Sequence, residues 1–111
     1  MFWKALTINK ELVDSEGMAN SYGNFGNVLL SRDDLDWAEE MFGKALEIDK
    51  KLNRPEGMGK TYANLGIVLQ ERGNLHGADE MYRKAIESWK QLGLLDRVER
   101  VQKLLDALQD K

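Results

Sequence analysis

Cysteine is absent from the sequence, and histidine occurs once. Without thiols the chain forms neither disulfide bonds nor thiolate metal sites. The single histidine, His76, has no second histidine, no cysteine and no carboxylate cluster at metal-binding spacing, and none of the few serines has a histidine partner within its own part of the chain. We therefore expect no metal, no cofactor and no catalytic function, and His76 as a surface residue.

An excess of positive charge and a long apolar run are also lacking. The net charge is −3 and the pI is near 5.2, whereas a nucleic-acid-binding protein needs a basic face. No apolar run approaches the roughly 20 residues of a membrane span, and the first residues carry no apolar signal core. An apolar content of 42% with 32% charged residues favours a folded, helical protein. These features predict a soluble, cytoplasmic protein that binds neither nucleic acid nor membrane.

The sequence repeats itself with a period of forty residues. Residues 1–40 and 41–80 are identical at 20 of 40 positions, and a third copy begins at 81 and fades after Leu92. Each copy contains two segments in which apolar residues recur at three- and four-residue steps, as in amphipathic helices. We therefore predict an all-α fold of about six helices, over 1–13, 16–31, 34–52, 56–72, 74–92 and 94–109.

Turn-forming residues divide these helices into units. "LNRPEG" (52–57) separates two repeats and places Pro55 in the first turn of a helix, while "SRDD" and "ERGN" are turns inside repeats. One domain, 1–111, is expected to contain a half-repeat helix (1–14), two repeats (15–53 and 54–93) and a C-terminal capping helix (94–111).

Glycine inside the second predicted helix needs a structural reason, because it costs ~1 kcal/mol against alanine. At 100° per residue, Tyr22, Phe25, Gly26 and Leu29 share one face, which we predict to be buried. Gly26 then allows a partner helix to approach closely at small residues such as Ala38, and Gly66 and Ala78 repeat the arrangement.

Small and large residues interlock at fixed offsets in a pattern that resembles the tetratricopeptide repeat. In the second unit its signature positions are Tyr62, Leu65, Gly66, Leu69, Gly73, Ala78, Tyr82 and Ala85. In the first unit they are Tyr22, Phe25, Gly26, Leu29, Asp33, Ala38, Phe42 and Ala45. The forty-residue period is similar to the subclass found in Leu-Gly-Asn repeat adaptors and kinesin light chains. The resemblance implies a right-handed α-solenoid of antiparallel helix pairs that binds a peptide or a helical segment of a partner protein in its concave groove.

Polar residues form a stripe on the side of the helix opposite the predicted core face. In this family, the side that carries such a stripe lines the groove. The candidate groove residues are Asn20, Asn24, Asn27, Ser31, Lys60, Asn64, Ile67, Gln70 and Glu71. Asparagine suits a ligand backbone because its amide both donates and accepts hydrogen bonds. The alternative is that these asparagines bond neighbouring helices or loops. The family's clamp for C-terminal carboxylates is disfavoured, because Gly23 and Ala63 stand where it has lysine.

The first residues resemble the second helix of a repeat without the helix that should precede it. Phe2 and Leu6 would then be exposed apolar residues, and exposed ends of repeat stacks tend to associate. The alternative function is therefore a self-assembly or scaffold module that forms a homodimer through its end helices. A further alternative is that the chain is a segment of a longer array.

Overall fold

The computed structural model describes residues 11–109, and this part of the chain contains five α-helices and no strand. The helices are α2 (Glu11–Ser31), α3 (Leu35–Leu52), α4 (Pro55–Glu71), α5 (Leu75–Gln91) and α6 (Leu95–Gln109). The predicted all-α fold is confirmed, and α3 to α6 begin and end within one residue of the predicted bounds. The right-handed winding and the division into one half-repeat, two repeats and a cap stay predictions.

The expected break near residue 14 is wrong, because α2 runs without interruption through residues 13–15. At the equivalent place after α3, Asn53 adopts a left-handed backbone with φ of 55° and Pro55 opens α4. Valine at position 13 is β-branched and disfavours a positive φ, and Ser15 keeps the backbone N–H that proline lacks. A helix therefore continues where the repeat pattern predicts a turn. The remainder of the predicted first helix, residues 1–10, lies outside the described residues.

The other turns recur with the repeat. Asp33 and Gly73, forty residues apart, have φ of 63° and 84°, and each lies in the turn inside a repeat. Asn53 and Gly93, again forty apart, have φ of 55° and 73° in the turns between repeats. Glycine adopts this backbone without strain, whereas Asp33 does not.

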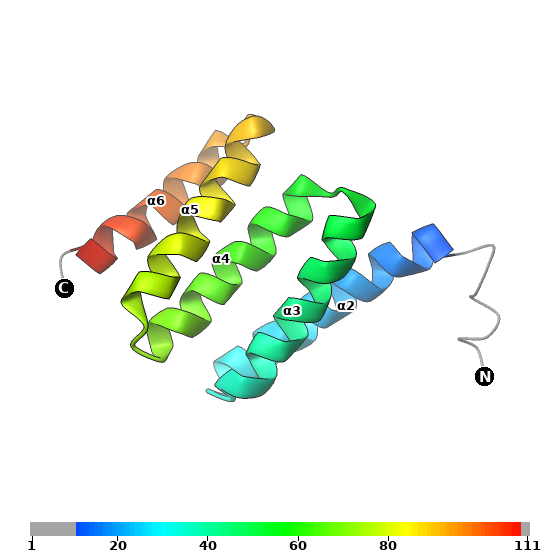
Figure 1. Ribbon diagram of the computed structural model, residues 1–111, viewed down its shortest axis with the longest axis horizontal. Helices are drawn as coiled ribbons and strands as arrows, with labels where there is room; N and C mark the ends of the chain where they lie inside the picture. Colours follow the sequence, from blue (N-terminus) through cyan, green and yellow to red (C-terminus); the bar gives the residue numbers. More distant parts are fainter. Residues whose placement is uncertain (1–10, 110–111) are drawn as a thin grey trace.

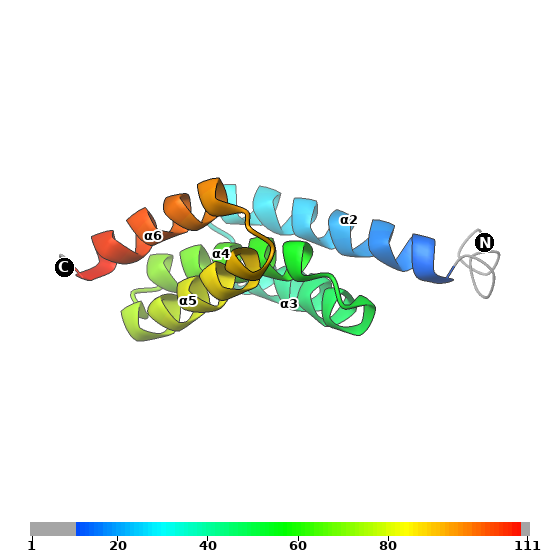
Figure 2. The same cartoon turned by 90° about the horizontal axis from the view of Figure 1, so that it is seen from above.

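The helices form two layers. Successive helices run antiparallel, and α2 and α6 lie at opposite ends of the molecule (Figure 1). Seen from above, α3 and α5 form one layer, while α2 and α6 lie on the other side with α4 set deeper between them (Figure 2). The layer of α2, α4 and α6 is thus recessed at its centre.

Each repeat is held together by an aromatic ring against a glycine. A Cβ atom added to Gly66 would lie 2.5 Å from Cε1 of Tyr82, and one added to Gly26 would lie 2.6 Å from Cε1 of Phe42. Both aromatic side chains are fully buried. The prediction that Gly26 lies in the packed face is confirmed, but the atoms that fill the space belong to an aromatic ring rather than to Ala38.

One prediction about the core is wrong. Phe25, placed on the buried face of α2, is 54% exposed, whereas Leu65, its counterpart on α4, packs against buried Ala38 and Phe42 of α3. The difference arises because α3 covers α4, and no helix among residues 11–109 covers α2 in the same way.

Candidate functional site

A groove of about 490 Å³ lies between α4 and α6, on the recessed layer. It is lined by Lys60, Asn64, Ile67, Trp89, Arg97, Arg100, Val101 and Leu104. The α4 residues follow each other at four- and three-residue steps and so share one face of the helix. The groove therefore joins three of the predicted residues to a face of α6.

Trp89, which lines the groove, is held in place by its neighbours. Its indole Nε1 donates a hydrogen bond to the Glu56 carbonyl oxygen at 3.1 Å, and a Cβ on Gly59 would lie 2.6 Å from the same nitrogen. The guanidinium carbon of Arg97 lies 5.6 Å from the centre of the indole ring, and its Nη1 donates to Glu56 Oε2 at 2.9 Å. Arg97 is thus held in place at the rim, with its charge partly balanced.

Two further cations line the groove. Among the described residues, neither Lys60 nor Arg100 makes an ion pair within 4.0 Å. Beside them, Ile67, Val101 and Leu104 supply apolar surface. The arrangement combines positive charge, the amide of Asn64 and an apolar floor.

The repeat register explains why these residues meet. Lys60 and Arg100 are forty residues apart, and so are Asn64 and Leu104. Their counterparts on α2 are Asn20 and Asn24. When the forty-residue register is continued from α4 into the third copy, it indicates Arg100 and Leu104 of α6 as groove residues.

The predicted residues of α2 lie on exposed surface but do not line this groove. Asn20, Asn24, Asn27 and Ser31 are all exposed, and the Ser31 hydroxyl donates to the Val28 carbonyl oxygen of its own helix at 2.8 Å. A role for these side chains in ligand binding remains a prediction. The candidate self-association residues Phe2 and Leu6 lie outside the described residues.

Gln70, another of the predicted α4 residues, is hydrogen-bonded to α5. Gln70 Oε1 accepts a hydrogen bond from the hydroxyl of Tyr82 at 2.8 Å. Burial, with a smaller contribution from the nearby Glu71 carboxylate, raises the pKa of Tyr82 to about 12, so this phenol stays neutral and donates. Gln70 thus has a structural partner, whereas Glu71 is exposed at the end of α4.

The residues that the sequence analysis missed are Trp89, Arg97, Arg100, Val101 and Leu104. The sequence predicts a capping helix over 94–111, and Trp89 is not among the predicted groove residues. A signal was available, because Arg100 is the next member after Asn20 and Lys60 in the forty-residue register.

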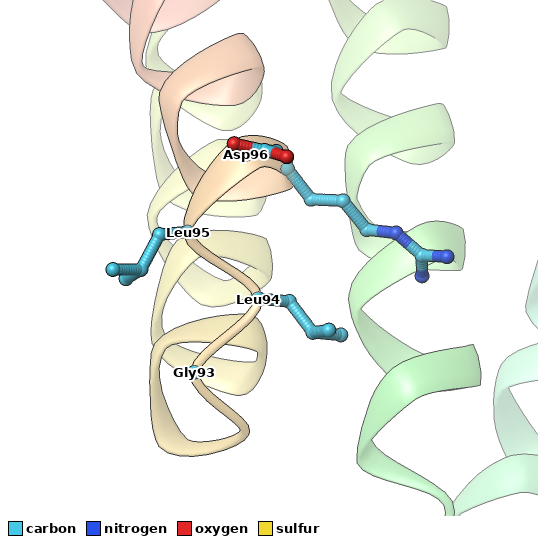
Figure 3. Close-up of a pocket in the computed structure, with 5 residues that line it drawn as sticks. Gly93, Leu94, Leu95 and Asp96 are labelled. Carbon is cyan, nitrogen blue, oxygen red and sulfur yellow. The ribbon is translucent and has the colours of Figure 1, made fainter.

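A second hollow, of about 310 Å³, lies at the turn between α5 and α6 (Figure 3). It is lined by consecutive residues, and Leu94 points toward α4 while Leu95 points away from it. Leu94 packs against the core, and Leu95 is 65% exposed. This hollow follows from the shape of one turn and gathers no side chains from separate helices.

No acidic or histidine cluster in the described part of the chain is arranged to hold a metal ion. His76 is exposed, as predicted. Within residues 11–109 no helix is both long and apolar enough to cross a membrane.

A family model described as tetratricopeptide repeat matches residues 17–91. This stretch contains most of the described helices and the α4 side of the groove, and the chain therefore belongs to the tetratricopeptide repeat family. Repeats of this family generally mediate protein–protein interactions. A search of curated proteins finds no match to the chain.

Proposed function

We propose that the chain is a non-catalytic interaction module that holds a segment of a partner protein in the groove between α4 and α6. The observation that carries the proposal is the meeting of Lys60, Asn64 and Arg100 above an apolar floor. A protein segment needs backbone hydrogen bonds, side-chain pockets and a charge match, and this groove offers a group for each.

The chemistry of the groove favours an acidic segment with an apolar anchor. Lys60 and Arg100 would face Asp or Glu side chains of the partner, and Ile67, Val101 and Leu104 would contact an aliphatic or aromatic residue. Asn64 would bond the partner backbone. Positive potential also speeds the encounter with an acidic partner, and that effect weakens as salt is added.

The test uses peptides selected from a random display library with the full chain as bait. Selected peptides are labelled and their affinity is measured by fluorescence anisotropy. We expect enrichment of Asp and Glu near an apolar residue, and affinity at least about tenfold weaker for Lys60→Glu and for Arg100→Glu, equivalent to about 1.4 kcal/mol. Asn64→Ala should weaken binding without changing its salt dependence.

The matched control is Lys103→Glu, which makes the same charge change at an exposed position of α6 outside the groove. It should leave affinity within about twofold, because screened charges that do not touch the ligand contribute little. Selected peptides without acidic residues, or an equal loss in the control and groove variants, would contradict the proposal.

A separate observation favours a second function, self-assembly. Apolar residues on one face of α2 are exposed, among them Phe25 at 54%, Val28 at 46% and Met18 at 44%. Exposed apolar residues that gather on one helix face are a typical interaction site. We propose that this face joins copies of the chain, independently of the groove.

A further inference from the structure

The exposed apolar face of α2 has an equivalent on α4 that shows what fits against it. We define the outer face of α2 as Met18, Ser21, Tyr22, Phe25 and Val28. The first four line a largely apolar hollow of about 340 Å³. The residues forty positions later are Met58, Thr61, Tyr62, Leu65 and Val68.

On α4 this face is covered by α3. Val68 is fully buried in one cluster with Ala38 and Phe42, whereas Val28 is 46% exposed. Leu46 of α3 packs against the neighbouring cluster that contains Tyr62. The partner that fits the outer face of α2 is therefore a helix that presents an aromatic residue and a leucine four positions later.

The first residues of the chain have this pattern. Phe2, Ala5 and Leu6 stand forty positions before Phe42, Ala45 and Leu46 of α3. "MFWKAL" thus matches "MFGKAL" at five of six positions. The sequence contains both the exposed face and a segment built to cover it.

Within one molecule, residues 2–6 cannot pack on the outer face of α2 in the way that α3 packs on α4. That packing needs a reversal at residues 13–15, where α2 is helical. A reversal before Glu11 leaves too few residues, because ten residues of helix span about 15 Å while Phe25 lies about 21 Å along α2 from Glu11. After the turn is subtracted, Phe2 would reach only the region of Met18.

We infer that the outer face of α2 is covered by residues 2–6 of a second copy, and that two copies exchange these segments reciprocally. The inference rests on the assembly function proposed above and adds its mechanism. When a helix replaces a turn, the segment that precedes it is directed away from its own molecule and can pack on a second copy. Exchange of an identical element between identical chains is a low-cost route to a dimer. One two-fold axis then covers the outer faces of both copies.

The first test restores the missing turn. Val13→Asn, Asp14→Arg and Ser15→Pro together copy the Asn53–Pro55 connection into the first repeat. Light scattering on the full chain across a wide concentration range should give twice 12.7 kDa for the unaltered protein and 12.7 kDa for this triple variant. Val13→Ala, which keeps the helix, should remain a dimer. Circular dichroism checks that each variant keeps its helix content.

The second test identifies the contact. Because the chain has no cysteine, a copy with Phe2→Cys and a differently tagged copy with Val28→Cys can be mixed and oxidised. We expect a disulfide that links the two differently tagged chains. The yield of this disulfide should be much lower when Ala107→Cys, at an exposed position of α6, replaces Val28→Cys.

The outcomes separate the mechanism from the function on which it rests. A monomer at every concentration overturns both. A dimer that persists in the triple variant, or that gives no more disulfide with Val28→Cys than with Ala107→Cys, overturns the exchange and leaves assembly by another surface.

Discussion

Gly66→Ala should destabilise the protein, although alanine is the better helix former. The added Cβ would lie 2.5 Å from Cε1 and 2.6 Å from Cδ1 of Tyr82, about 1 Å closer than ordinary contact. The ring has little room to yield, since Tyr82 is fully buried and its hydroxyl is bonded to Gln70. Overpacking of this kind costs about 1–3 kcal/mol, and the tight geometry places it near 3. A helix-propensity gain of ~1 kcal/mol leaves a net loss of about 2 kcal/mol.

Gly23→Ala is the matched control, because nothing lies within 4 Å of a Cβ at that position and the second repeat has Ala63 there. It should stabilise the protein by up to ~1 kcal/mol. Urea denaturation at one protein concentration, followed by circular dichroism, should separate the two midpoints by about 1–2 M. If both variants shift in the same direction, the contact between Gly66 and the Tyr82 ring does not control the packing of this repeat.

Two further predictions concern single residues. Asp33→Gly should raise the free energy of unfolding by about 0.5–1 kcal/mol and Gly73→Asp should lower it similarly, because both positions have a positive φ; thermal unfolding checks the opposite signs. Trp89→Phe removes the indole bond to the Glu56 carbonyl and should cost about 1 kcal/mol in urea denaturation, and an unchanged midpoint would show that this bond contributes nothing.

The sequence predicts helix positions well because apolar periodicity and turn residues act locally. Asp33, Asn53, Gly73 and Gly93 mark the turns, and four helices follow from them within one residue. The exception is residue 14, where the repeat pattern suggests a turn but valine and serine replace asparagine and proline. Position in a repeat is thus a weaker guide than the residue types themselves.

The site is harder to predict because a helical wheel gives the direction of a side chain but not its reach or its neighbours. Lys60, Asn64 and Ile67 share the expected face, but the wheel cannot show that α6 supplies the other wall. Gln70 lies beside the predicted stripe, yet its long side chain reaches the Tyr82 hydroxyl. Phe25 has the pattern of a core residue, and its exposure depends on what lies beyond α2.

A buried carboxylate at the junction of the two repeats gives a test of the electrostatics. Asp49 of α3 is 3% exposed and accepts a hydrogen bond from Arg54 Nη1 at 2.9 Å, and Arg54 Nε lies 3.7 Å from Glu16 Oε2. Burial raises the pKa of Asp49 above 3.8 despite the opposing charges of Arg54 and Lys60, and the charge of Glu16 raises it further.

The raised pKa of Asp49 makes protonation favour the folded state. Its contribution to stability is therefore greatest below pH 3.8, the unfolded value, and is lost as the pH rises through the folded value. Asp49→Asn removes this titration, so the stability of the unaltered protein relative to the variant should fall as the pH rises from about 4 toward neutrality. Urea denaturation at several pH values measures the difference, and Glu16→Gln should shrink its pH dependence. A difference that grows with pH would mean that the ion pair with Arg54 outweighs the burial of the carboxylate.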